Sequence, residues 1–160
     1  MSNLLIVHHS PTDTLHALTD ALVAGARDDA IEGVDVSVVA ALDASADDVL
    51  SAHGFVVVTP ANFGYMSGAM KHFFDTIFLQ VGGSLSDDGS AAESRATKKP
   101  YGLLVHGRYD TTGAVRSVQG IVQALGWHQS SAVVEILGDV GEVELDRATE
   151  LGATLAALLT

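Results

Sequence analysis

Short apolar runs alternate with longer segments of helical period along this chain. The runs are rich in β-branched side chains and lie at Leu4–Val7, Val34–Ala40, Phe55–Thr59, Tyr101–Val105 and Ala132–Leu137. Runs of this length and composition are typical of strands that are buried on both faces of a parallel sheet. The pattern therefore predicts five parallel strands.

The segments between the runs carry apolar residues three and four positions apart, as helices with one buried face do. These residues are Leu15, Leu18, Leu22 and Ala26 after the first run; Met66, Met70, Phe73, Phe74, Ile77 and Phe78 after the third; Val115, Val118, Val122 and Leu125 after the fourth; and Ala148, Leu151, Leu155, Leu158 and Leu159 after the last. The link Leu42–Ser51 has room for a helix of at most two turns.

Strands that alternate with helices predict one α/β domain over residues 1–160, a three-layer α/β/α sandwich. For five strands the doubly wound order 2-1-3-4-5 is the natural choice. It puts a ligand crevice beyond the carboxyl ends of the first, third and fourth strands. Residues 81–99 are rich in Gly, Ser, Ala, Asp and Glu, and we expect a flexible loop there, or a lid over a ligand.

Composition narrows the range of functions. The chain has 160 residues, no Cys, and 20 acidic against 8 basic side chains, for a net charge of −12. Without Cys there is no disulfide, thiolate zinc site, cysteine-ligated cluster or cysteine nucleophile. The negative charge argues against binding to nucleic acid or to an anionic membrane. No apolar run approaches the roughly 18–20 residues of a membrane span, and Met1–Val7 is too short and uncharged for a signal peptide, so we expect a cytoplasmic protein.

The loop after the first strand, Ser10–Leu15, carries three hydroxyl side chains at the predicted start of a helix. Short hydroxyl donors next to the free amides of a helix N-terminus form a cradle for phosphate. The alternative is ordinary helix capping, for which Ser, Thr and Asp are the preferred residues.

The loop after the third strand, Thr59–Gly68, places Phe63 and Tyr65 where no core requires an aromatic side chain. Aromatic rings there offer a face or an edge to a planar ligand, although such a pair can also plug the core. Gly64 allows close approach of the backbone, and Asn62 can both donate and accept hydrogen bonds. Ser67 is suited to cap the next helix.

The run Thr59–Asp75, TPANFGYMSGAMKHFFD, closely resembles a loop and helix of flavodoxin-fold flavoproteins. It is most similar to NAD(P)H:quinone oxidoreductases of the tryptophan-repressor-binding-protein type and to related FMN reductases, which have Pro-x-x-Phe-Gly-x-Met-Ser-Gly there. The resemblance implies a flavodoxin-like fold. It also implies FMN as the cofactor, with this loop lining the isoalloxazine ring.

The other two loops resemble that family more weakly. Ser10 and Thr12, with Thr14 close by, resemble its Ser-x-Thr-Gly-x-Thr phosphate loop, and the loop after the fourth strand, 106–113, sits where that family's loop borders the ring. The predicted FMN-binding residues are Ser10, Thr12, Asp13, Thr14, Leu15, Pro60, Ala61, Asn62, Phe63, Gly64, Tyr65, Met66, His106, Gly107, Arg108, Tyr109 and Asp110.

The chain departs from the family pattern in three places. Asp13 stands where the phosphate loop has Gly, and Leu15 where it has its last Thr. Ala41–Gly54 is too short to hold the insertion of the quinone oxidoreductases. Arg108 and Tyr109 stand where the family mostly has Gly, Ser and Thr. We expect them to be catalytic, Tyr109 by orienting a substrate and Arg108 by stabilising negative charge; the alternative for Arg108 is a surface residue near Asp110.

Two functions are consistent with these residues. The first is an enzyme that takes hydride from NAD(P)H and passes electrons to a quinone or a free flavin. The second is an electron carrier that docks a basic redox partner through its acidic surface. A flavin-free binding module is a third reading, and a homodimer through the apolar Phe73–Leu79 end is an expectation from the family.

No metal site is expected, because His8, His9 and His106 lack the spacing of metal ligands. The chain also has neither Gly-x-Ser-x-Gly nor Gly-x-Gly-x-x-Gly after a strand.

Overall fold

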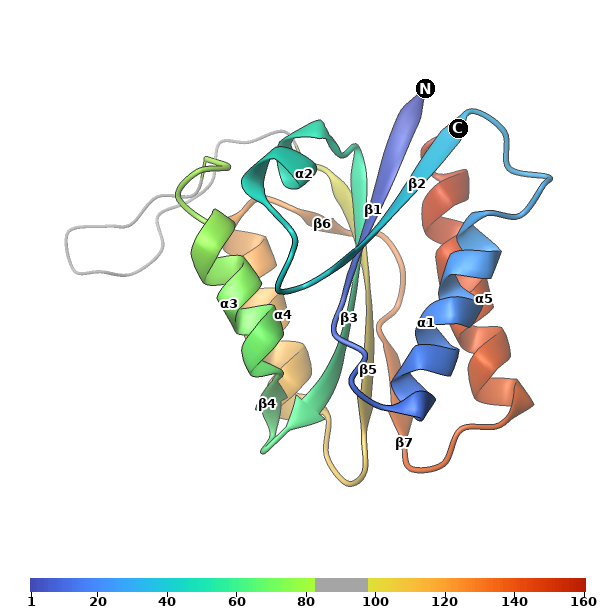
Figure 1. Cartoon of the computed structure of the whole chain (residues 1–160), viewed down its shortest axis with the longest axis vertical. Coiled ribbons are helices and arrows are strands. Elements are labelled where there is room, and N and C mark those ends of the chain that lie inside the picture. The colour runs from blue at the N-terminus through green and yellow to red at the C-terminus, as the bar shows by residue number, and fades with distance from the viewer. Residues whose placement is uncertain (83–97) are drawn as a thin grey trace.

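A parallel sheet forms the centre of the molecule. The computed structural model describes residues 1–82 and 98–160. The sheet order is β2 (Val34–Ala40), β1 (Ser2–His8), β3 (Gly54–Asn62) and β5 (Pro100–Gly107). The last position is shared by two short strands that both pair with β5, namely β6 (His128–Gln129) and β7 (Val134–Leu137). The predicted order 2-1-3-4-5 is thus confirmed, with β7 inside the expected fifth strand and β6 as an additional short strand before it (Figure 1).

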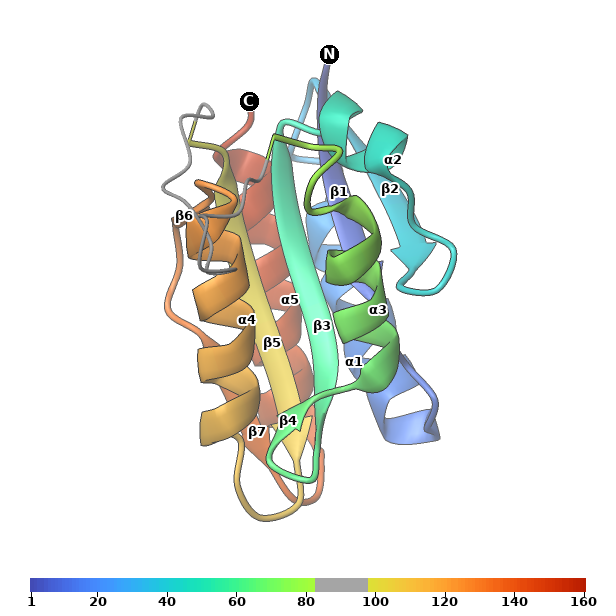
Figure 2. The ribbon, with the colours of Figure 1, turned by 90° about the vertical axis from the view of Figure 1, so that its left-hand side faces the viewer.

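Helices cover both faces of this sheet, as predicted. α1 (Asp13–Ala26) and α5 (Glu142–Ala157) lie on one face, and α2 (Ala46–Ser51), α3 (Gly68–Ile77) and α4 (Thr112–Ala124) lie on the other (Figures 1 and 2). Neighbouring residues of a strand point to opposite faces, so Leu4 and Ile6 pack with α1 and α5 while Leu5 and Val7 pack with α3 and α4. Each layer of helices therefore has its own apolar core.

Glycines let α1 and α5 touch backbone to backbone. A Cβ atom on Gly25 would lie 2.0 Å from the carbonyl oxygen of Thr149, and one on Gly152 would lie 2.0 Å from that of Leu22. Because real Cβ atoms do not approach a backbone oxygen so closely, each contact requires Gly.

The segment after β3 differs from the prediction. Met66 does not belong to the helix; it forms β4 (Tyr65–Met66), which pairs antiparallel with the end of β3. The two residues of the turn, Phe63 and Gly64, have φ of 51° and 72°. Two positive φ values in a two-residue hairpin are typical of a type I′ turn, whose twist matches that of the strands. The helix begins only after Ser67, which caps it through a bond from the N–H of Met70 to its hydroxyl.

Two further expectations need correction or lie outside the structure. Leu158 was expected on the buried face of the last helix but is 53% exposed, whereas the next residue, Leu159, packs against the core. The predicted loop 81–99 lies for the most part outside the described residues. Among the helices of residues 1–82 and 98–160, none is long and apolar enough to cross a membrane.

Candidate functional site

The three loops predicted to bind a ligand meet at one edge of the sheet. β1, β3 and β5 are adjacent, and their carboxyl ends are in register: His8 lies beside Val58, and Pro60 beside His106. The loops that leave these strands lie toward the lower end of the view in Figure 1. The chain reverses its direction of winding at β1, with β2 on one side and β3 on the other, and doubly wound sheets bind ligands at such a point.

The first loop forms the N-terminus of α1. The hydroxyl of Thr12 caps this helix by accepting from the N–H of Leu15 at 3.2 Å. The hydroxyl of Ser10 lies 2.9 Å from Nδ1 of His8 and 2.7 Å from Oγ1 of Thr19. Both hydroxyls therefore have partners inside the protein, but only that of Thr12 caps the helix.

Backbone donors remain free at the same place. Within the described ranges, the N–H groups of Thr12, Asp13 and Thr14 have no hydrogen-bond acceptor. Together with the dipole of α1, these amides suit an anionic group such as a phosphate. The exposed carboxylate of Asp13 opposes that charge. The side chain of Leu15, also predicted to bind FMN, is 1% exposed and lies in the core, so it is not available to a ligand.

The second loop is a hairpin that presents aromatic side chains to solvent. Phe63, at the turn, is fully exposed, and Tyr65 is 44% exposed. Met66 differs from its predicted role, because its side chain is buried beside Met70. The loop thus offers two aromatic rings, while Met66 anchors it.

A buried hydrogen-bond network holds the base of this hairpin. The N–H of Ser67 donates to Oγ1 of Thr59 at 3.0 Å, and the two hydroxyls lie 3.2 Å apart. Since Ser67 also caps α3, the end of β3 and the start of α3 are fixed to each other.

The third loop is exposed and carries the predicted catalytic residues. Tyr109 is 90% exposed. Nη1 of Arg108 lies 3.3 Å from Oδ1 of Asp139, in the loop between β7 and α5. The alternative to a catalytic role for Arg108 was a surface residue near Asp110. Asp110 instead accepts a hydrogen bond from the N–H of Thr112 at 2.9 Å. This bond lowers the pKa of the Asp110 carboxyl.

Glycines bring the second and third loops together. A Cβ atom on Gly113, in the first turn of α4, would lie 1.8 Å from the carbonyl oxygen of Gly64. One on Gly107 would lie 3.1 Å from Cβ of Ala61. The hairpin therefore rests directly on the end of β5 and the start of α4, as Figure 2 shows.

A fourth loop at this edge was missed by the sequence analysis. It follows β7 and holds Asp139, the partner of Arg108, and Gly138, whose carbonyl oxygen lies 2.7 Å from Nε2 of His106. Its position after the last strand was the available signal, because all parallel strands end at the same edge.

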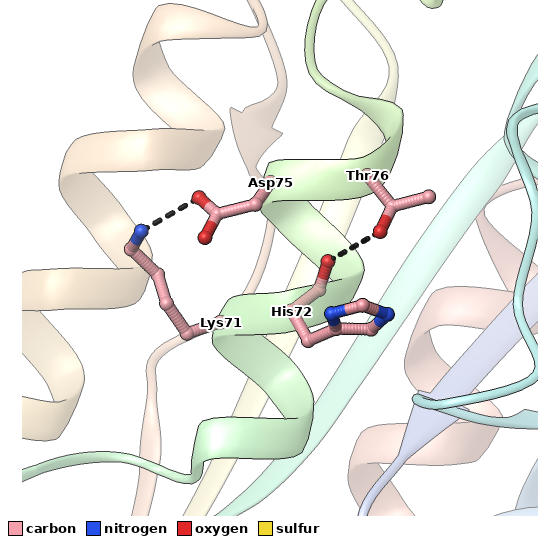
Figure 3. Close-up of polar contacts among 4 residues, drawn as sticks. All are labelled: Lys71, His72, Asp75 and Thr76. Carbon is pink, nitrogen blue, oxygen red and sulfur yellow. Dashed lines mark hydrogen bonds and ion pairs between the residues drawn. The ribbon is translucent and has the colours of Figure 1, made fainter.

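Polar residues elsewhere serve the helices themselves. In α3, Lys71 pairs with Asp75 at 2.6 Å on the side toward α4, and on the opposite side the hydroxyl of Thr76 donates to the carbonyl oxygen of His72 (Figure 3). In the part of the chain that the structure describes, no group of three His, Asp or Glu side chains is placed to hold a metal ion.

Comparison with known proteins identifies a family. Residues 12–138 match the family described as NADPH-dependent FMN reductase. This range includes most of the first loop and all of the second and third.

Two curated relatives match parts of the chain. A flavodoxin of Aquifex aeolicus is 32% identical over 58% of this chain and 48% of its own length. An NAD(P)H dehydrogenase (quinone) of Acidithiobacillus ferrooxidans is 28% identical over 70% of this chain and 62% of its own length. The chain thus spans about half of the first relative and three fifths of the second.

Solved structures confirm the fold. A flavodoxin from the domain Archaea superposes with a TM-score of 0.78 at 17% identity, over 98% of both chains. The flavodoxin-like arrangement predicted from the sequence is therefore correct.

Proposed function

Because the chain belongs to the NADPH-dependent FMN reductase family, we propose that it is an FMN-binding oxidoreductase that uses NAD(P)H as electron donor. A quinone or a free flavin is the proposed acceptor. The cofactor site is the carboxyl edge of the sheet, across the loops of residues 10–15, 60–66 and 106–112.

The donors at this edge suit the two ends of FMN. The free amides of Thr12, Asp13 and Thr14 would hold the phosphate at the N-terminus of α1. Phe63, Tyr65 and Tyr109 would contact the ring system with their exposed aromatic faces. FMN is preferred to FAD because the family that the chain matches is described by FMN.

Bound FMN supplies the ability to accept a hydride equivalent from a nicotinamide and to pass electrons on. The side chains of this protein would bind the flavin and orient the substrate. Phe63 and Tyr109 would align a nicotinamide or an acceptor over the ring and exclude water from it. Arg108 would offset negative charge, and it is available because its ion pair with Asp139 is exposed to solvent.

One observation carries this proposal. In a segment that matches the family, Phe63 is held fully exposed and at a φ of 51°, which non-glycine residues rarely adopt. An exposed aromatic ring in a strained backbone gains nothing from the fold itself, so its role lies with a ligand.

The test is flavin binding followed by turnover. We expect the purified protein to absorb in the blue, to quench the fluorescence of added FMN, and to oxidise NADH or NADPH when a quinone is present. A Phe63→Ala variant should bind FMN about 5- to 150-fold more weakly, since an aromatic contact of this kind contributes about 1–3 kcal/mol. A matched Phe78→Ala variant, changed at the far end of α3, should bind FMN normally. A colourless protein that leaves FMN fluorescence unchanged would contradict the proposal.

A second function is supported by charge. With a net charge of −12 and a flavodoxin among its relatives, the chain also suits an electron carrier that docks a basic redox protein. Electron transfer from a ferredoxin-type reductase should then fall steeply as ionic strength rises, without any oxidation of NAD(P)H by the protein alone. Turnover in this assay only would favour the carrier over the reductase.

A further inference from the structure

An imidazole stands directly behind the first loop. His8 is the last residue of β1, and its Nδ1 lies 2.9 Å from the hydroxyl of Ser10, which lies 2.7 Å from the hydroxyl of Thr19 in α1. These three side chains form one hydrogen-bonded row beneath the free amides of the loop. Helix capping does not require a His at this place, because the cap of α1 is Thr12.

The direction of the bonds in this row depends on the charge of His8. When His8 is neutral and Nδ1 accepts, Ser10 must donate its only hydroxyl proton to the imidazole. When His8 is protonated, Nδ1 donates to Ser10, and the hydroxyl proton of Ser10 can be donated either to Oγ1 of Thr19 or to a bound ligand. Protonation therefore releases the Ser10 hydroxyl proton from the imidazole and adds a positive charge at a loop that carries the carboxylate of Asp13.

We propose that His8 is a positioning residue for a phosphate monoester in the first loop, and that it takes up one proton as the phosphate binds. The protonated imidazole offsets the charge of Asp13, and it orients Ser10 through the Nδ1 bond. This inference rests on the proposed function, because the phosphate is that of FMN.

The groups around His8 favour the uptake of a proton by its imidazole when the ligand binds. Partial burial, followed by the nearby His16 and His9, lowers the pKa of the free His8, and only Asp20 acts in the opposite direction. His16 and Asp20 come from α1, His9 from the chain next to it, and β2 and β3 place the uncharged Ala40 and Val58 beside it. In the absence of ligand these effects therefore favour the neutral form of His8. A phosphate dianion nearby raises the pKa, so proton uptake falls between the two pKa values.

The test compares FMN with riboflavin, which lacks the phosphate, by fluorescence quenching across about pH 5.5 to 8.5. We expect the Kd for FMN to rise with pH by up to about tenfold per unit within the window, and the Kd for riboflavin to stay flat. The phosphate of FMN itself loses its second proton at about pH 6, and this strengthens its binding as the pH rises. Because this effect is the same in the wild type and in a variant, the two pH profiles are compared.

His8→Asn is the informative variant. Its side-chain amide can donate to Ser10 permanently, so it should keep FMN binding but lose the pH-dependent weakening seen in the wild type. His16→Gln is the matched control, which should keep the slope and move the window to higher pH. An NMR titration of the His8 imidazole should show a higher pKa with FMN bound than with riboflavin bound.

The outcomes separate this inference from the proposed function. If FMN binds but the wild type and His8→Asn share one pH profile, the role of His8 is wrong while the flavin site stands. If FMN binds at no pH, both are wrong.

Discussion

Residue by residue, the candidate site combines groups that stabilise the fold with groups that do not. Thr12, Ser67 and Asp110 cap or fix helices, and each has a partner inside the protein. Phe63 and Asp13 are exposed and do little for the fold. Substitutions at these two residues should therefore separate ligand binding from stability.

Phe63→Asn should raise stability and lower flavin affinity. Asn tolerates positive φ better than Phe, and no buried area is lost, because Phe63 is fully exposed. We expect the free energy of unfolding to rise by about 0.5–1 kcal/mol in urea titrations. Tyr109→Asn, at an equally exposed residue whose φ is not positive, is the control and should leave stability unchanged. A loss of stability in Phe63→Asn would mean that the ring packs on the protein.

Asp13→Asn should bind FMN about tenfold more tightly, because a unit charge a few ångströms from a phosphate changes binding by about 1 kcal/mol per charge even in a water-like medium. Fluorescence titrations at low and moderate salt measure this gain, which should shrink as salt rises. Asp29→Asn makes the same charge change beyond the other end of α1 and serves as the control. Equal gains in both variants would point to net charge rather than to a local effect.

At the scale of elements, the contact between the β3–β4 hairpin and α4 sets the shape of the site. Gly113→Ala should lower the free energy of unfolding by about 1–3 kcal/mol, because its Cβ has no room beside the carbonyl oxygen of Gly64. Gly120→Ala, in the same helix, should raise it by about 0.5–1 kcal/mol, because nothing lies within 4 Å of the added atom and Ala favours helix. Urea unfolding of both variants measures the difference.

FMN affinity gives an independent readout of the same pair. It should fall in Gly113→Ala, whose hairpin must move, and stay constant in Gly120→Ala. Similar stabilities for the two variants would show that the hairpin does not rest on α4 in solution.

The strands and helices could be predicted because each buries its own apolar residues in a regular pattern. The hairpin could not be predicted in this way. Met66 and Met70 are four positions apart, as in a helix, and the turn at Phe63 and Gly64 depends on backbone angles that the pattern of apolar residues does not reveal. The position of the site followed from the topology. The partners of its side chains did not, since Arg108 and Asp139 lie far apart in the sequence and meet only through the pairing of β5 with β7.

For the molecule as a whole, the dominant electrostatic feature is excess negative charge. The described residues include two ion pairs, and the side chains of both are substantially exposed. Because exposed ion pairs contribute little to stability, little attraction is lost when salt screens them. Repulsion among the acidic groups is the larger effect at a net charge of −12.

The midpoint of thermal unfolding should therefore rise by a few degrees when NaCl increases from about 0.01 to 0.3 M at neutral pH, as this shortens the screening length from about 30 Å to below 10 Å. Calorimetry measures it. The gain should nearly vanish close to the pI of about 4.6, where the net charge is small. A midpoint that falls with salt would mean that attraction between surface charges dominates.

The glycine contacts between α1 and α5 also bear on the order in which the chain folds. α1 comes early in the sequence, yet the backbone that it packs against belongs to residues near Thr149 and Gly152, far downstream. During synthesis the apolar face of α1, with Leu18 and Leu22, must therefore wait for α5 to emerge from the ribosome before it is fully covered. Because this long-range contact closes one face of the sheet so late, the apolar face of α1 stays exposed, and prone to aggregation, during the interval.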